Sequence, residues 1–153
     1  LERQVCLSSD SPESKITLGR SVTLRQDSTI KSCQTSSIEI GQFTQVGAHC
    51  WICGTADIKI GSNCQIGNRA ILRAIPLKLA DLFPTAQLQE PISQGIVIED
   101  NCCIGEGVCV LAGVTIGEGS MVGDDAIVTD NVPPYSIVVG APATILDGCL
   151  KDC

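Results

Sequence analysis

Few side chains in this 153-residue chain are suited to chemistry: there is one histidine, and there are ten cysteines. His49 lies in the stretch VGAHCWICG, in which Cys50 and Cys53 have the C-x-x-C spacing. A redox or zinc site with that spacing calls for a helix N-terminus or a second cysteine pair, and neither is visible. The sequence therefore predicts no metal site.

Charge and hydropathy exclude two classes of partner. The formal net charge is −7, and residues 79–150 contain ten acidic side chains and no Lys or Arg. Such a surface repels nucleic acid and anionic membranes. No apolar run reaches 18 residues, so no membrane span is expected. The first residues do not resemble a signal peptide and lack Met, which is consistent with a trimmed chain or a fragment. The many free cysteines favour a reducing cytoplasm.

Most of the chain follows a six-residue repeat. An aliphatic residue recurs at every sixth position in five groups of three. The groups are Leu18, Leu24, Ile30; Ile40, Val46, Ile52; Ile60, Ile66, Leu72; Ile98, Ile104, Val110; and Ile116, Val122, Val128. The next position is often Gly, and the fifth position is mostly small or β-branched. Each repeat therefore predicts one short strand and a tight turn, with the first position pointing inward and the fifth position at a corner.

Three such strands complete one coil, and the coils stack by parallel strand pairing. Cys50, Cys64 and Cys102 occupy fifth positions and are interpreted as small inward residues rather than ligands. Cys53, Cys103 and Cys109 fall at positions outside the core pattern and are expected to be more exposed.

The repeat also sets the domain organisation. We expect the domain to run from residue 16 to residue 148, with residues 149–153 as a tail that contains Cys149 and Cys153. Residues 1–15 are either a disordered lead or a capping segment, and their Ser and charge content favours disorder. Twenty additional residues between Leu72 and Ile98 predict one long loop, residues 73–96, which is apolar and expected to pack on a neighbouring subunit.

The C-terminal stretch GVTIGEGSMVGDDAIVTDNVPPYSIVVGAPATIL contains Val132-Pro133-Pro134-Tyr135-Ser136 followed by Gly140-Ala141-Pro142-Ala143. It resembles the end of the hexapeptide-repeat acyltransferases, in particular the maltose, galactoside and capsular-sugar O-acetyltransferases. The resemblance covers residues 38–147. It implies an all-β fold, a left-handed parallel β-helix of about five triangular coils with one excursion loop, and a homotrimer with active sites between subunits.

The resemblance also implies a reaction. In that family a histidine acts as general base on a sugar hydroxyl, which attacks the thioester of acetyl-CoA, and backbone amides stabilise the oxyanion. The co-substrate is acetyl-CoA, and its pantetheine arm lies along the coils. Carried to this chain, the implied CoA contacts are Gly105, Ala112, Gly123, Ala126, Ala141 and Pro142.

The expected histidine is missing from the loop. The maltose-type enzymes place it just before Pro-Leu, whereas here Ile75 precedes Pro76 and Leu77. Related sugar N-acyltransferases place a catalytic histidine within a coil, so His49 is the candidate base, with Glu39 or Asp57 to orient it. The alternative is an exposed corner histidine without a role. A carbonic anhydrase of the γ class, which needs three histidines, is excluded.

Other departures affect the CoA site. Asp124, Asp125 and Asp130 stand where the family carries small residues or a Lys, and Thr144 replaces a common cation. Carboxylates should weaken binding of the CoA phosphates, although a neighbouring subunit could supply Arg69 or Arg73. Trp51 suits an interface or a substrate platform.

Two hypotheses therefore stay open. One is an acyl-CoA-dependent acyltransferase that acts on a sugar. The other is a catalytically inactive trimeric scaffold or binding module that has kept the fold and lost the family histidine and cations.

Overall fold

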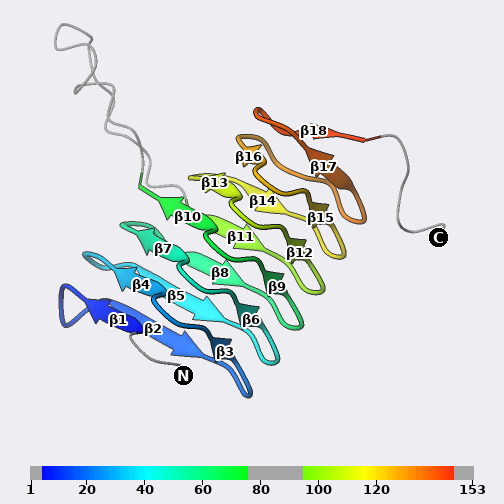
Figure 1. The fold of residues 1–153 in the computed structure, drawn as a ribbon. Helices are drawn as coiled ribbons and strands as arrows, with labels where there is room; N and C mark the ends of the chain where they lie inside the picture. Colours follow the sequence, from blue (N-terminus) through cyan, green and yellow to red (C-terminus); the bar gives the residue numbers. More distant parts are fainter. Residues whose placement is uncertain (1–4, 76–94, 147–153) are drawn as a thin grey trace, which may run out of the picture.

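The computed structural model describes residues 5–75 and 95–146, and the regular structure of these residues consists of strands. The chain winds as a β-solenoid of about five turns, and each turn adds one strand to each of three parallel sheets (Figure 1). The predicted all-β solenoid is confirmed. Within the described ranges, no helix has the length and apolarity needed to cross a bilayer.

From β1 to β16, every third strand belongs to the same sheet, and β17 and β18 both extend sheet C. Sheet A contains β1 (Cys6–Ser9), β4 (Thr29–Ser32), β7 (Trp51–Gly54), β10 (Ile71–Ala74), β13 (Cys109–Leu111) and β16 (Ile127–Val128). Sheet B contains β2 (Lys15–Leu18), β5 (Ser37–Ile40), β8 (Ile58–Ile60), β11 (Ile96–Ile98) and β14 (Thr115–Ile116). Sheet C contains β3 (Thr23–Leu24), β6 (Gln45–Val46), β9 (Gln65–Ile66), β12 (Cys103–Ile104), β15 (Met121–Val122), β17 (Ile137–Val139) and β18 (Thr144–Ile145).

The core is a column of aliphatic side chains stacked coil upon coil. In sheet A, for example, Ile30, Ile52, Leu72, Val110 and Val128 follow one another in register. All fifteen first-position residues predicted to point inward are buried except Leu18, which is partly buried in the terminal coil. Successive coils bring the same repeat positions into contact, so each aliphatic side chain packs on the one in the next coil. Side chains of this size are sufficient to fill the narrow interior without aromatic rings.

The corners from sheet B to sheet C and from sheet C to sheet A depend on a left-handed backbone at the fourth position of a repeat. Phe43, His49, Asn63, Arg69 and Asn101 have φ between 58° and 61°. The backbone N–H of each donates to the third-position carbonyl of the preceding coil, as from His49 to Gln26 at 3.0 Å. The chain can therefore turn tightly without leaving its amide groups unpaired.

The fifth-position side chains provide a second set of corner bonds. Thr44 Oγ1 donates to the Gly61 carbonyl at 2.7 Å, and Cys50 Sγ donates to the Gly67 carbonyl at 3.1 Å. The same bond, from the fifth position of one coil to the second position of the next, is made by Ser28, Cys64 and Cys102. Ser120 donates in the same way to the Pro133 carbonyl, which follows Val132, the residue paired with Ile116. Position five therefore favours a small side chain, and where that side chain is Ser, Thr or Cys it also donates to the next coil; Ala70 and Val108 fill the same position without a donor.

The ends of the solenoid differ from the expectation. Cys6–Ser9, placed in a lead expected to be disordered, forms β1, which pairs in parallel with β4. Of the two alternatives for this segment, the strand agrees with a capping segment; the polar composition that favoured disorder does not reveal pairing through the backbone. At the other end β18 pairs antiparallel with β17. The excursion is narrower than expected, because β10 ends at Ala74 and β11 begins at Ile96; residues 76–94, their packing on a neighbour, and the tail with Cys149 and Cys153 lie outside the described residues.

Replacing Thr44 by Val tests the corner bonds. The substitution keeps the shape of the side chain but removes the donor to Gly61 and the acceptor for the Cys64 amide, all in a fully buried position. We expect Thr44→Val to lower the free energy of unfolding by about 1–3 kcal/mol in denaturant titrations. Thr17→Val on the exposed face of β2 is the matched control and should change it by less than about 0.5 kcal/mol. Equal effects of the two substitutions would contradict the role given to the corner hydroxyl.

Candidate functional site

His49 lies at the corner between sheets C and A, in a column of fourth-position residues. Asp27 occupies the same position one coil earlier, and Arg69 occupies it one coil later; their φ angles are 58°, 58° and 60° for Asp27, His49 and Arg69. The hydrogen bonds from the His49 amide to Gln26 and from the Arg69 amide to Ala48 hold these coils in register. Three ionisable side chains therefore project from one edge of the solenoid.

Asp27 is the carboxylate that lies beside the histidine. His49 Nδ1 is 3.7 Å from Asp27 Oδ2, and the two side chains are 54% and 36% exposed. The sequence prediction named Glu39 or Asp57 for this role, but Asp57 accepts a hydrogen bond from the Ser37 amide at a different corner. The repeat contains the signal that would have identified Asp27, because Leu24 and Val46 each precede these fourth positions by three residues.

The Arg69 guanidinium faces the opposite direction along the column. Its Nη2 atom is 3.9 Å from Glu106 Oε2, and both side chains are more than half exposed. An exposed pair at that distance is weak, so the guanidinium can exchange this partner for an anionic ligand at little cost.

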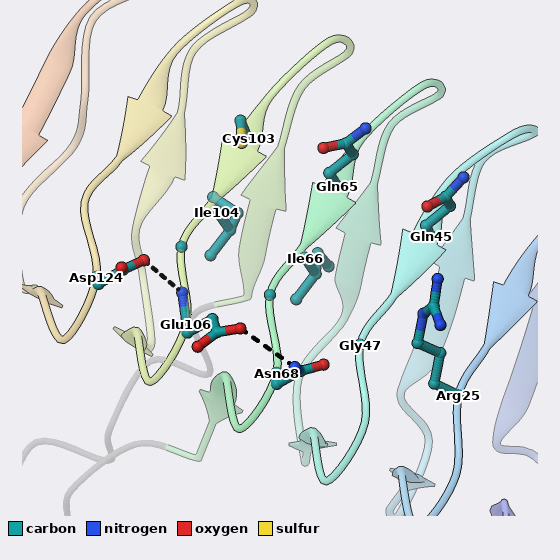
Figure 2. A pocket seen from close by; sticks show the side chains of 12 residues that line it. Arg25, Gln45, Gly47, Gln65, Ile66, Asn68, Cys103, Ile104, Glu106 and Asp124 are labelled. Carbon is teal, nitrogen blue, oxygen red and sulfur yellow. Dashed lines mark hydrogen bonds between the residues drawn. The ribbon is translucent and has the colours of Figure 1, made fainter.

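A shallow groove of about 250 Å³ runs over sheet C and borders this corner (Figure 2). Its floor is formed by the second-position glycines Gly47, Gly67 and Gly105. A Cβ atom at Gly67 would lie 2.6 Å from the Gly105 carbonyl carbon, so the floor cannot accommodate side chains there. One wall carries Gln45, Gln65 and Cys103, and the other carries Asn68, Glu106 and Asp124 (Figure 2).

The second wall is tied together by hydrogen bonds within the protein. Asn68 Nδ2 donates to Glu106 Oε1 at 3.2 Å, and the Glu106 amide donates to Asp124 Oδ1 at 2.9 Å (Figure 2). The Ala48 amide donates to Asn68 Oδ1 at 2.9 Å. The polar side chains of this wall therefore already have hydrogen-bond partners within the protein, which hold them in place. Arg25 lies at the end of the groove, next to Gln45.

The remaining predicted substrate residues lie on sheet A. Trp51 is 48% exposed on the outer face of β7, and Ile71 is its partner in β10. Arg73 lines an apolar pocket of about 230 Å³ with Ile75, Leu111 and Ala112. The structure therefore places Arg73 and the predicted CoA contact Ala112 together, beside the isoleucine that replaces the expected histidine.

The other predicted CoA contacts are dispersed. Gly105 lies in the groove on sheet C, and Gly123 lies against the side chain of Val139. Ala126 is fully buried, which leaves its methyl group no contact with a ligand on the surface. Ala141 and Pro142 lie exposed between β17 and β18.

Four of the eight cysteines in the described ranges are buried in the solenoid. Cys50, Cys64 and Cys102 are at most 2% exposed, as predicted, and burial raises the pKa of the Cys50 thiol. A hydrogen bond with Cys64, together with burial, raises the pKa of Cys102. Cys53, expected to be exposed, is 5% exposed; it lies next to Cys33, whose pKa is raised to about 11 by burial and by the nearby Asp10 side chain. Among the described residues, no group of three or more His, Cys, Asp and Glu side chains is arranged to hold a metal ion.

No protein-family model matches the sequence, and no curated protein matches it. Solved structures do match. PerB from Caulobacter crescentus, in complex with CoA and GDP-perosamine, is 20% identical with a TM-score of 0.67; the match covers 94% of this chain and 55% of that one. The present chain therefore spans about half the length of PerB.

Two further structures match over 95% of this chain. AntD, an N-acyltransferase from Bacillus cereus in complex with dTDP-4-amino-4,6-dideoxyglucose and coenzyme A, is 20% identical with a TM-score of 0.71 and 81% of its chain covered. A maltose O-acetyltransferase from Clostridium difficile is 20% identical with a TM-score of 0.58 and 67% covered. These neighbours are sugar acyltransferases of the hexapeptide-repeat β-helix family, and this chain has their fold. The resemblance indicated by the sequence is confirmed at the level of fold.

Residue-resolved alkylation tests the assignment of the cysteines. We expect iodoacetamide at pH 8, followed by peptide mass spectrometry, to modify Cys6, which is exposed, and to leave Cys50, Cys64 and Cys102 unmodified in the native protein. All four thiols should react in denaturant. Rapid native labelling of Cys64 or Cys102 would contradict their placement inside the corners.

Proposed function

We propose that this protein is an acyl-CoA-dependent acyltransferase that transfers an acyl group, acetyl in the simplest case, to a hydroxyl group of a sugar. The observation that carries this proposal is the match of nearly the whole chain to sugar acyltransferases, two of them determined with CoA and a nucleotide-linked sugar. Since a shared fold does not define a reaction, the residues of the site must also support it.

His49 is proposed as the general base. Its side chain is exposed, and Nδ1 faces Asp27, which leaves Nε2 to accept a proton from an acceptor hydroxyl. Asp27 is proposed to orient the ring and to stabilise it when it carries the proton. A histidine with a carboxylate partner is the minimal arrangement for general-base activation of a weak nucleophile.

Acetyl-CoA, when bound, supplies the activated acyl group. The pocket of Arg73, Ile75, Leu111 and Ala112 is proposed to hold an apolar part of this co-substrate, with the Arg73 guanidinium available to an anionic group. Arg69 and Arg73 are the proposed partners of the CoA phosphates, because residues 95–146 contain no Lys or Arg. Gly123, Ala141 and Pro142 stay proposed contacts along the coils, whereas Gly105 lies in the separate groove on sheet C.

We propose that the active protein is a homotrimer and that it acts in the cytoplasm. We further propose that it has no nucleic-acid partner and no membrane span. The exposed Trp51 on sheet A suits a subunit interface. The alternative of an inactive scaffold rests on Ile75 and on the acidic residues Asp124, Asp125 and Asp130; the structural neighbours give it no support.

Titration calorimetry and a transfer assay test the proposal. We expect acetyl-CoA to bind with a micromolar Kd, and His49→Ala to keep that Kd within about twofold while lowering kcat by about 10²–10⁴-fold on an accepted sugar. CoA release should be followed by chromatography, because the ten cysteines would react with thiol reagents. Absence of binding at millimolar acetyl-CoA would favour the inactive scaffold.

Asp27→Asn tests the positioning of the ring. The pair is half-exposed and 3.7 Å apart, so its loss should reduce kcat by only about two- to fivefold, without changing the Kd for acetyl-CoA. Asp57→Asn is the matched control: it keeps an acceptor for the Ser37 amide and should leave kcat unchanged. A larger loss in the control than in Asp27→Asn would remove Asp27 from the site.

A further inference from the structure

We propose that the groove on sheet C is the acceptor subsite and that it selects a sugar carrying an anionic group, which Arg25 binds while Gln45 and Gln65 bind the sugar hydroxyls. This inference rests on the proposed function, since it identifies the class of acceptor presented to His49. The shared chemistry is a phosphate or a carboxylate attached to a sugar.

Arg25 is the cation of the groove. Its side chain is exposed and points toward Gln45 (Figure 2), and none of the ion pairs among the described residues involves it. The Arg25 amide donates to the Val46 carbonyl at 3.1 Å, which fixes its backbone against the coil that carries the groove wall. A fixed backbone with a free guanidinium suits two-point binding of a phosphate or a carboxylate.

Gln45 and Gln65 supply neutral donors and acceptors. They are direct partners in the ladder between β6 and β9, so their side chains leave the same face of sheet C about 4.8 Å apart. Within residues 5–75 and 95–146, no hydrogen bond occupies either carboxamide. Each carboxamide offers two N–H donors and a carbonyl acceptor, the combination that sugar hydroxyls require.

The charge distribution sets the orientation of the ligand. Glu106 and Asp124 line the end opposite Arg25, and both accept hydrogen bonds from within the protein. These carboxylates would repel an anion placed there, whereas the Arg25 end would attract it. An anionic sugar is therefore directed to lie with its charge beside Arg25 and its ring over Gln45 and Gln65.

Two other hollows on the described surface do not offer this combination. The hollow over sheet B is lined by Lys59 but also by Glu99, Asp100 and Glu118, so carboxylates dominate it. The pocket at Arg73 is mostly apolar and lacks carboxamides.

The groove also lies next to the proposed base. Gly47 on its floor precedes His49 by two residues, and Arg25 precedes Asp27 by two residues. The same two coils therefore contribute the anion site on sheet C and the His49–Asp27 pair at the adjoining corner. A sugar held by Arg25 and Gln45 lies at the edge from which His49 projects.

Binding of defined probes tests the subsite without requiring turnover. UDP-N-acetylglucosamine provides a phosphate, glucuronic acid provides a carboxylate, and methyl glucoside is the neutral reference; each is titrated at low salt and followed by ligand-detected NMR. We expect at least one anionic probe to bind about tenfold or more tightly than methyl glucoside. Arg25→Gln should abolish that preference, and Gln65→Glu should weaken the anionic probe further than methyl glucoside.

Arg20→Gln is the matched control, because Arg20 is an exposed arginine at a different corner, outside the groove. It should keep the preference for the anionic probe. Binding of the phosphate probe alone or of the carboxylate probe alone identifies the anion and supports the subsite. Equal binding of all three probes, or equal losses in Arg20→Gln and Arg25→Gln, would overturn it.

The two proposals fail separately. His49→Ala should bind the anionic probe as the unaltered protein does. Arg25-dependent binding without any acyl transfer would leave the subsite standing and remove the acyltransferase function. Acyl transfer to an anionic sugar with a KM unaffected by Arg25→Gln would support the acyltransferase function and contradict the subsite.

Discussion

The structure depends on how each coil turns its corners. At the corners from sheet B to sheet C and from sheet C to sheet A, the fourth-position backbone adopts positive φ, and from the second coil onward its N–H donates to the third-position carbonyl of the preceding coil. At the fifth position a small side chain must fit inside the corner, and in several coils it also donates to the next coil. Both bonds join neighbouring coils, so the stacking distance and the register follow from them. The aliphatic column then fills a space whose width the corners have already determined.

The same constraint determines where side chains are free to act. First and fifth positions are occupied by packing, and second positions are often glycines that lie close to the next coil. Fourth-position residues project outward from an edge, and the strand residues between inward positions project from the flat faces. Asp27, His49 and Arg69 belong to the first of these classes, and Gln45 and Gln65 belong to the second. Ligand-binding chemistry in this fold is therefore assembled from residues one coil apart.

Much of the fold follows from the sequence because the repeat is local. Any one hexapeptide indicates which residue is buried and which residue sits in the corner, as Cys50 and Cys64 illustrate. The terminal strands did not follow, because β1 and β18 pair through their backbones and carry no repeat. Cys53 is buried by residues of an adjoining coil, including Cys33, which its own hexapeptide does not reveal.

The site was less predictable than the fold. His49 was recognised as the sole histidine, but its partner Asp27 lies 22 residues earlier and becomes visible only when successive coils are aligned. The groove likewise combines residues of β6, β9 and β12 with corner residues of several coils. Contacts of this kind depend on the exact length of each turn, including the additional residues between repeats. In the sequence, those additional residues appear only as interruptions of the six-residue repeat.

The excursion between β10 and β11 shows how such a scaffold can change. Ile96 re-enters sheet B beside Ile58, and Val110 pairs with Leu72, so the ladder continues as if the intervening residues were absent. An insertion at a corner is thus invisible to the coils on either side of it. Insertion or removal of a whole coil would, in contrast, move Arg25 relative to Glu106 by one strand spacing of about 4.8 Å. The groove of the solenoid can therefore be lengthened or shortened in evolution only by whole coils, in steps of that size.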